Sequence, residues 1–247
     1  MRLSVLGGWG AFPPSGGACS GYVLDHDGFT VVLDPGYATF PRLLGLVDAG
    51  AVDAVLVTHG HPDHCADLNP LLRARVLADL PSPPLPLHAP PGALGPVLAL
   101  DVPRMLAGSY VLHEFAPGES FELGPFEVTT VELPHFVLDA GLRLSVGGRA
   151  IAYTGDCGPS RHVVELARDA DLLLAEATFA EAVPARQAGG LSTALDVAGE
   201  AAAAGVGHLV LTHLWPGTDP DAARNAAAPA FPGRISVASE GLAIEVR

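Results

Sequence analysis

Three histidines and an aspartate are crowded into six positions near residue 60. In the segment VLVTHGHPDHCADL, residues 55–68, they are His59, His61, Asp63 and His64. They follow an apolar run typical of a buried strand, where a polar side chain costs free energy unless it finds a partner. Imidazole and carboxylate groups suit zinc, iron or manganese, and a bound ion removes that cost. The alternative is a histidine-rich surface turn, but this spacing directly after an apolar strand favours a metal site.

A strand and a helix are expected to position the cluster. Residues 51–58 (AVDAVLVT) have strand composition, and residues 66–80 (ADLNPLLRARVLADL) have a helical pattern. The first two histidines can point the same way from extended backbone, while Asp63 and His64 come round as the chain turns into the helix. The cluster is therefore predicted at the C-terminal end of a strand, where it can supply ligands to two ions.

Short strands and helices alternate along the rest of the chain. In the first half we predict strands at 2–7, 21–25 and 29–34, a helix at 40–50 that begins with Pro41 and ends at Gly50, and a proline-rich loop around a short strand at 81–92. In the second half we predict strands at 109–115, 126–133, 142–146, 150–155, 171–178 and 208–214, and helices at 161–169 and 193–205. Two sets of strands with helices outside them predict an α/β layered sandwich.

Length and composition fit one domain over residues 1–247. The chain is 49% hydrophobic and 16% charged, which is enough to build a large core. No apolar stretch approaches the roughly 20 residues that cross a bilayer, and the N-terminus does not resemble a signal peptide, so we expect a soluble cytoplasmic protein. Three widely separated cysteines argue against a disulfide framework and agree with a reducing compartment.

The charge of the chain argues against a nucleic-acid partner. The formal net charge is -14, and all thirteen basic residues are arginines, with no lysine. Binding of a long polyanion normally depends on many lysine and arginine contacts to phosphate. We therefore expect a small-molecule substrate, with no long nucleic acid and no membrane as partner, and leave a homodimer open.

The histidine cluster resembles the H-x-H-x-D-H motif of the metallo-β-lactamase superfamily. Later motifs follow in the family's order over most of the chain: ELPHFV with His135, YTGDCG with Asp156 and LVLTHL with His213. The resemblance implies a four-layer αββα sandwich with a dinuclear site. It assigns the first ion to His59, His61 and His135, the second to Asp63, His64 and His213, and Asp156 to both.

The same resemblance implies roles for the carboxylates and for the metals. Asp156 would bridge the ions and fix their spacing, and Asp63 would add negative charge to the second, so these two are the predicted catalytic residues. Asp34, in VVLDPG, would orient a ligand histidine. Two zinc ions are expected, with manganese or iron as alternatives, and a metal-bridging hydroxide would attack the substrate. Glu176 either supports the site or only caps a strand end.

The segment LLLAEATF and the residues after it resemble the C-terminal half of ribonuclease Z and related phosphodiesterases. Ala175 and Leu191 replace histidines usual in that family, of which the first is thought to assist the leaving group. A phosphodiesterase acting on a small or cyclic phosphodiester is therefore implied. Two alternatives stay open. One is a carboxylic ester, lactone or thioester hydrolase with the same metal site, which Arg143 and Arg161 near the motifs mildly oppose. The other is a non-enzymatic metal-binding protein.

The histidines outside the motifs are predicted to have structural roles or to lie on the surface. They are His26, His88, His113, His162 and His208.

Overall fold

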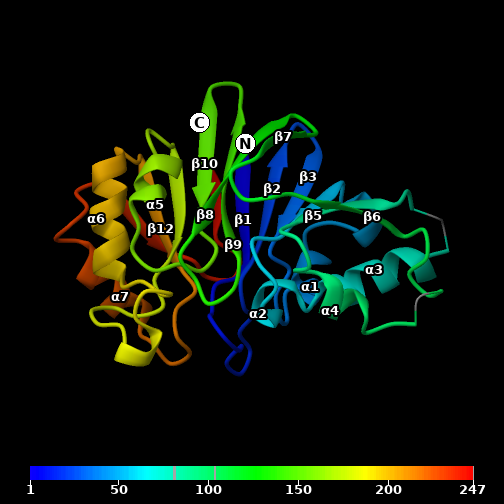
Figure 1. The fold of residues 1–247 in the computed structure, drawn as a ribbon, viewed down its shortest axis with the longest axis horizontal. Coiled ribbons are helices and arrows are strands. Elements are labelled where there is room, and N and C mark those ends of the chain that lie inside the picture. The colour runs from blue at the N-terminus through cyan, green and yellow to red at the C-terminus, as the bar shows by residue number, and fades with distance from the viewer. Residues whose placement is uncertain (80–81, 103, 247) are drawn as a thin grey trace.

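Two seven-stranded sheets pack face to face, with helices on both outer faces (Figure 1). The computed structural model describes residues 1–79, 82–102 and 104–246. The first sheet has the order β14 (Ala243–Glu245), β1 (Arg2–Gly7), β2 (Gly21–His26), β3 (Phe29–Leu33), β4 (Ala54–Leu56), β5 (Leu85–Ala89) and β6 (Tyr110–Glu114). The second has the order β13 (Arg234–Val237), β12 (His208–Thr212), β11 (Leu172–Glu176), β10 (Arg149–Tyr153), β9 (Asp139–Val146), β8 (Phe126–Leu133) and β7 (Ser120–Leu123).

Two groups of helices form the outer layers. The first sheet is covered by α1 (Phe40–Leu43), α2 (Pro62–Cys65), α3 (Leu68–Leu77) and α4 (Gly95–Leu98). The second is covered by α5 (Arg161–Leu166), α6 (Ala194–Ala204) and α7 (Pro220–Ala227), and two short 3-10 turns span Ala49–Ala51 and Ala185–Gln187. The predicted four-layer αββα sandwich is confirmed.

Three apolar clusters hold the layers together. Leu56 of the first sheet and Leu142 and Leu174 of the second are fully buried between the sheets. Separate clusters lie under each helical layer. Each such leucine contributes about 1.5–3 kcal/mol by leaving water. Because the strands alternate their side chains between these clusters, the residues at the strand ends are held in fixed directions.

Each sheet has a parallel part and an antiparallel part, and the parallel parts place the functional loops. Strands β3, β4, β5 and β6 run parallel, as do β10, β11, β12 and β13, while the remaining neighbours are antiparallel. The carboxyl ends of parallel strands meet at one edge of a sheet. Ligand-bearing loops that follow β4, β10 and β12 are therefore brought to a common edge of the sandwich.

Local sequence explains most helix limits. In α6, Thr193 accepts a hydrogen bond from the N–H of Asp196, whose carboxylate in turn accepts from the N–H of Thr193, and Gly205 ends the helix with φ of 71°. The predicted helix at 193–205 is thus confirmed, as is the short strand β5 inside the proline-rich stretch. The predicted helix at 66–80 is shorter, since α3 ends at Leu77; residues 80 and 81 lie outside the described residues.

One predicted helix is wrong. The expected helix over residues 40–50 is only the single turn α1, followed by turns in which Leu46 and Val47 donate to the carbonyl of Leu43. Gly45, at the point where α1 stops, lowers helix propensity and lets the chain leave the helical path. The elements α4, β7, β13, β14 and α7 were not predicted. Among the helices of the described residues, none has both the length and the apolar composition needed to span a membrane.

Candidate metal centre

The first four ligand candidates lie directly after β4. The chain leaves the strand at Leu56, and the loop that follows carries His59 and His61. Pro62 starts α2 in the position where a helix tolerates proline, and the single turn of α2 contains Asp63 and His64. The apolar strand thus fixes where the cluster begins, and the proline turns the last two side chains back toward the first two.

The second sheet supplies the other three candidates from three loops. His135 follows β8, Asp156 follows β10, and His213 comes directly after β12. His213 has φ of 56° and Asp34, directly after β3, has φ of 45°, a left-handed conformation that costs a non-glycine residue free energy. Both strained residues contribute to the cluster, so the fold holds them in conformations that the local sequence disfavours.

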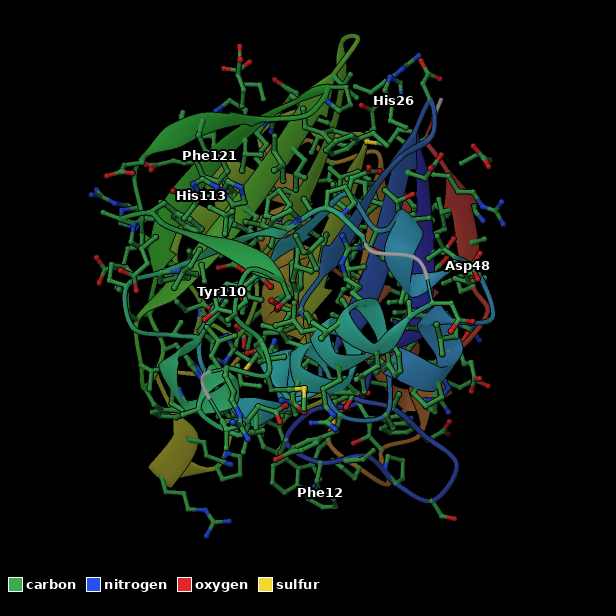
Figure 2. All side chains as sticks on the ribbon, turned by 90° about the vertical axis from the view of Figure 1, so that its right-hand side faces the viewer. Phe12, His26, Asp48, Tyr110, His113 and Phe121 are labelled. Carbon is green, nitrogen blue, oxygen red and sulfur yellow. The ribbon has the colours of Figure 1, made fainter. Side chains whose placement is uncertain are left out.

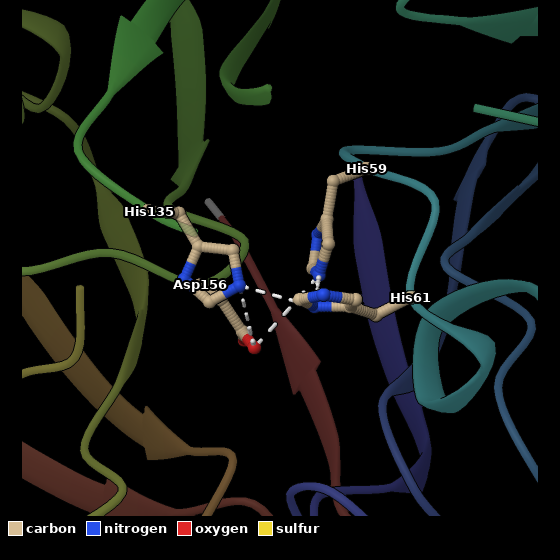
Figure 3. Close-up of side chains that lie close together, drawn as sticks. All are labelled: His59, His61, His135 and Asp156. Atoms are coloured by element: carbon tan, nitrogen blue, oxygen red, sulfur yellow. Dashed lines mark hydrogen bonds and ion pairs between the residues drawn. The ribbon is translucent and has the colours of Figure 1, made fainter. Parts of the chain in front are cut away.

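The first group consists of His59, His61, His135 and Asp156 (Figure 3). The Nε2 atoms of His59 and His135 lie 3.0 and 3.1 Å from Nδ1 of His61. Both Nε2 atoms are 3.9 Å from Oδ2 of Asp156. One nitrogen of each ring and a carboxylate oxygen therefore converge on one point.

The second group consists of Asp63, His64, His213 and again Asp156. Nε2 of His213 lies 3.2 Å from Oδ2 of Asp63 and 3.1 Å from Oδ2 of Asp156. Nε2 of His64 lies 3.1 Å from Oδ1 of Asp156 and 3.7 Å from Oδ2 of Asp63. All seven residues predicted as ligands are brought together in the two predicted sets, and Asp156 is shared between them.

The inner ring nitrogens are left available because the outer ones are already bound. Nδ1 of His64 lies 2.7 Å from Oδ2 of Asp34, which also accepts from the hydroxyl of Tyr153. Nδ1 of His135 lies 2.8 Å from the carbonyl oxygen of Gly190. These carboxylate and carbonyl acceptors require a proton on Nδ1, and this leaves a lone pair on Nε2 for an ion. Asp34 therefore takes the orienting position that was predicted for it.

Two further supports were missed by sequence reasoning. Oδ1 of Asp139 lies 3.0 Å from Nδ1 of His59, and both side chains are completely buried. The hydroxyl of Thr178 lies 2.8 Å from Nδ1 of His213 and donates to Oε2 of Glu176 at 2.8 Å. Asp139 had no motif around it, whereas Thr178 follows Glu176 within the AEAT segment and could have been found there.

Glu176 supports the site, which resolves the earlier alternative. It is fully buried and accepts hydrogen bonds from the backbone N–H groups of Cys157, Thr178 and Ser192 as well as from the Thr178 hydroxyl. It thus ties the loop after Asp156 to the segment before α6 and, through Thr178, to His213. Burial, together with the charge of Asp156, raises the pKa of Glu176 to about 8.

The pKa values of the buried ligand candidates are shifted in opposite directions. Burial lowers the pKa of His59 well below its usual value, and nearby His64 adds to this effect. Burial also opposes the charged form of His64, but the carboxylates of Asp156, Asp63 and Asp34 outweigh it and raise its pKa well above the usual value. The imidazoles of His213 and His64 hold the pKa of Asp156 well below its usual range, against burial. Opposite charges inside the site thus hold ionised carboxylates in the protein interior.

Two buried atoms indicate that the donor set fits a metal. Nε2 of His64 and Oδ1 of Asp156 have no hydrogen-bond partner within the described residues, although they are only 3.1 Å apart. Unpartnered polar atoms in the interior are rare and call for an explanation such as an ion. Imidazole nitrogens and carboxylate oxygens are ligands that zinc accepts. The residues present therefore fit two metal ions.

Positions singled out for their departure from the ribonuclease Z pattern differ in orientation. Ala175 is fully buried in the cluster under α5 and α6, while the next residue along β11, Glu176, faces the ligand groups. A histidine at position 175 would consequently point away from the ligands, so its absence does not remove a group from the site. Arg143, expected near the site, donates instead to the carbonyls of Leu166 and Arg168.

The remaining histidines lie apart from the ligand groups. His88 and His113 stack with ring centroids 4.7 Å apart, and Phe121 stacks on His88 at 5.1 Å. They line a cavity of about 600 Å³ that contains none of the seven ligands. Figure 2 shows His113 and Phe121 far from Phe12, which lies at the lower end of the molecule. Burial lowers the pKa of His88 to about 4, in agreement with a structural role.

Comparisons with known proteins identify the same family over most of the chain. Residues 29–214 match the family described as beta-lactamase superfamily domain. The probable metallo-hydrolase YhfI of Bacillus subtilis is 29% identical over 252 residues, covering 99% of this chain and 100% of that protein, and its crystal structure matches with a TM-score of 0.90, covering 99% of both chains. Ribonuclease Z of Kineococcus radiotolerans is 32% identical over 264 residues, covering 86% of this chain and 83% of the relative.

A human enzyme extends the likeness. The crystal structure of human tRNase Z, short form, matches with a TM-score of 0.80 and 25% identity, and the match covers 100% of both chains. The family match, the full-length relatives and the two ligand groups agree with one another. This chain belongs to the beta-lactamase superfamily and is one of its metallo-hydrolases.

Proposed function

We propose that this protein is a dinuclear metal-dependent phosphodiesterase that hydrolyses a small phosphodiester. The observation that carries the proposal is the position of Asp156, whose carboxylate belongs to both ligand groups. A carboxylate shared by both groups would hold two ions at a fixed separation, an arrangement that stabilises the attacking and leaving oxygens of an in-line displacement. The ribonuclease Z and tRNase Z relatives are named for acting on RNA, a phosphodiester polymer.

The two ligand groups can be assigned to two ions, which we propose to be zinc. His59, His61 and His135 would hold the first, Asp63, His64 and His213 the second, and Asp156 both. When bound, such ions polarise the scissile group and lower the pKa of water so that hydroxide can attack near neutral pH.

The chain itself contributes positioning and charge. Asp34, Asp139 and Thr178 hold three ligand rings in fixed orientations, which avoids the reorganisation that a mobile ring would need. The carboxylates of Asp63 and Asp156 are buried, so their negative charge acts at low dielectric. Catalysis therefore rests on prearranged ligands and needs no protein nucleophile.

Charge restricts the substrate to a small anion. Within the described part of the chain, no arginine side chain forms a hydrogen bond or ion pair with either ligand group; the arginines contact carbonyls and carboxylates elsewhere, as Arg42 does at Gly16 and Glu240. Two divalent ions exceed the charge of the two ligand carboxylates by only two. A monoanionic diester suits this balance, whereas an RNA needs many more cationic contacts than an acidic chain of charge -14 supplies.

A carboxylic ester, lactone or thioester is the second candidate. Phe136, Val137 and Leu138 follow the ligand candidate His135 and are all more than 40% exposed. An apolar approach of this kind suits an uncharged acyl group.

The cysteines bear on localisation, which we propose to be cytoplasmic. Cys19, Cys65 and Cys157 are all free and buried, which supports a reducing compartment.

Steady-state kinetics on three substrates test the proposal. kcat/KM is measured with zinc-loaded protein for bis(p-nitrophenyl) phosphate, p-nitrophenyl acetate and a precursor tRNA at one physiological salt concentration. We expect hydrolysis of the phosphodiester, its loss after chelation and return on adding zinc, and little RNA cleavage. Val111→Ala, at an exposed position on β6, controls for effects of mutagenesis and purification, and its kcat/KM is expected to match the wild type. Activity confined to the carboxylic ester would replace the proposal by the second candidate, and efficient RNA cleavage would overturn the restriction to small substrates.

A further inference from the structure

Three aromatic side chains form a cluster beside the second ligand group. Trp215 follows the ligand candidate His213 by two residues, and its backbone N–H donates to the carbonyl of Thr178 at 3.0 Å. The ring of Phe179 stacks against Trp215 with centroids 6.0 Å apart and an angle of 18°. The ring of Phe12 meets Trp215 at 84° with centroids 6.1 Å apart, yet Phe12 is 52% exposed. An aromatic ring thus remains largely in water next to the site.

Short contacts hold the loop of Phe12 against the ligands. The N–H of Ala11 donates to Oδ2 of Asp63 at 2.7 Å. Gly10 lies so close to His213 that a Cβ at Gly10 would be 2.5 Å from Cε1 of the imidazole. A glycine is therefore required there, and the loop cannot move away without losing the bond to Asp63. The position of Phe12 relative to the second group is consequently fixed by the ligands themselves.

A further aromatic residue, Phe136, lies beside the first ligand group. The ring of Phe136 is 4.9 Å from the ring of His135, centroid to centroid, and is 56% exposed. Gly190, whose carbonyl accepts from His135, packs against the same ring, since a Cβ at Gly190 would be 2.7 Å from Cζ of Phe136. Phe136 is thus held between a ligand and the residue that orients that ligand.

We infer that Phe12, Trp215 and Phe136, here called the aromatic rim, bind a planar aromatic substituent of the substrate. The inference rests on the proposed phosphodiesterase function and specifies its substrate as a phosphodiester with an aryl or nucleobase ring. Phe12 and Phe136 are 52% and 56% exposed beside two ligand groups that share Asp156, whereas Trp215 is partly buried. Exposed aromatic rings beside a site favour the binding of a ligand there, because their burial in a complex gains free energy. The ring of Phe136 contacts a ligand, the backbone of Trp215 is bonded to the partner of a ligand, and Phe12 directly follows a residue whose N–H donates to a ligand. The occupant must therefore reach the ligand groups, as a small substrate does.

Charge and ring chemistry favour this occupant over a polar one. Within the described residues, no arginine forms a hydrogen bond or ion pair with the ligand groups, so uncharged side chains are the better candidates for affinity beyond the ions. Stacking on an aromatic side chain contributes to the binding of aryl rings and of any nucleobase, without sequence-specific hydrogen bonds. A planar substituent is therefore recognised by shape and stacking.

A matched set of phosphodiesters tests the rim. Methyl, phenyl and thymidine 5′-esters of p-nitrophenyl phosphate share one leaving group and differ in the retained group, and each kcat/KM is divided by the rate of that diester in hydroxide solution. For the wild type we expect the phenyl or the thymidine diester to exceed the methyl diester by about 5- to 100-fold, the range of one stacking contact. The two aromatic arms distinguish an aryl group from a nucleobase. Equal corrected rates for all three would overturn the inference.

Single substitutions separate recognition from a structural effect. Phe12→Ala and Trp215→Ala should each lower the ratio of phenyl to methyl kcat/KM by about fivefold or more, whereas Phe12→Tyr and Trp215→Phe, which keep a ring, should retain it. Val111→Ala should leave the ratio at the wild-type value. If the alanine variants reduce both substrates equally, so that the ratio stays constant, the rings have only a structural role and the inference is wrong.

A binding measurement separates this inference from the proposed function. Calorimetry compares diphenyl phosphate with dimethyl phosphate on the zinc-loaded protein, and we expect at least about fivefold tighter binding of the diphenyl compound, lost in Phe12→Ala. This result, in a protein that hydrolyses esters and no phosphodiester, would keep the rim and reject the phosphodiesterase. Phosphodiester hydrolysis without a preference for rings in either assay would keep the phosphodiesterase and reject the rim.

Discussion

Oδ1 of Asp139 lies 3.0 Å from Nδ1 of His59, and neither side chain is exposed to solvent. The same oxygen accepts a long hydrogen bond, 3.4 Å, from the backbone N–H of Asp156. Burial, reinforced by the charges of Asp156 and Asp34, raises the pKa of Asp139 well above its usual value. One carboxyl group thus contacts a ligand of the first group and the residue shared by both groups.

Replacing Asp139 should weaken metal binding without removing a ligand. Asp139→Ala deletes the acceptor that orients His59, and we expect zinc affinity at the first group to fall by about 10- to 100-fold. Asp139→Asn keeps an oxygen and should lose less. Competition with a chromogenic chelator measures the affinity. Asp101→Asn, in a carboxylate paired with Arg73 away from the site, is the matched control. Unchanged zinc affinity in Asp139→Ala would show that the contact with His59 does not support the ligand.

Replacing Asp156 should have the largest effect of any single substitution. Asp156→Ala removes an oxygen from both ligand groups, so hydrolysis should fall to background and at least one ion should be lost. Activity assays and elemental analysis measure the two effects, and circular dichroism checks the fold. His162→Ala, on α5 outside both groups, should retain the wild-type activity. Similar activities of the two variants would contradict the assignment of Asp156.

The purified protein should contain close to two transition-metal ions per chain. The two ligand groups hold five imidazoles and two carboxylates that are mostly buried, so removal of the ions leaves repelling and unpartnered groups inside the protein. A chelator should therefore lower the Tm by on the order of 10 °C, and zinc should restore it. A metal count near zero in protein never exposed to chelator, with no change of Tm on adding zinc or manganese, would contradict the dinuclear site.

The site could be predicted from the sequence where a ligand occupies a motif at a strand end. His59, His61, Asp63 and His64 are close in sequence, so their grouping follows from one loop and one helical turn. Asp139 could not be found this way, because its contact with His59 spans 80 positions and depends on how the start of β9 meets the loop after β4, where the N–H of Ala140 donates to the carbonyl of Thr58. Long-range contacts of single residues leave no local pattern.

The fold was predictable to the level of layers and not to the level of every element. Alternating strands and helices indicated the sandwich, since apolar periodicity reflects burial on one face. The prediction of a helix at 40–50 was wrong because the chain forms only one helical turn and then continues as turns bonded to the carbonyl of Leu43. Strands β13 and β14 were missed because they are edge strands of only four and three residues, too short to show a reliable period of two in the sequence. Tertiary packing decides such segments.

A carboxyl group outside the metal centre provides a test of pH dependence. Glu200 on α6 accepts a hydrogen bond from the N–H of Ser160 at 2.7 Å, and its other oxygen, Oε2, is buried without a partner in the described residues. Burial raises the pKa of Glu200 to about 7, against the hydrogen bond from Ser160. The folded protein therefore binds a proton at this residue, between pH 4.5 and 7, that the unfolded chain releases.

The sign of the effect follows from this difference in bound protons. Because the folded-state pKa lies above the unfolded value, Glu200 favours folding at low pH, and that stability is lost as the pH rises from about 4.5 to about 7. Glu200→Gln carries no charge at any pH and can still accept from Ser160. Its free energy of unfolding should match the wild type near pH 4.5 and exceed it by on the order of 1–2 kcal/mol at pH 8, a value discounted for partial exposure. Urea denaturation at both pH values measures the difference, with Glu127→Gln, an exposed carboxylate on β8, as control. A Glu200→Gln protein that gains no stability relative to the wild type between the two pH values would show that the buried carboxyl group is not held in its protonated form.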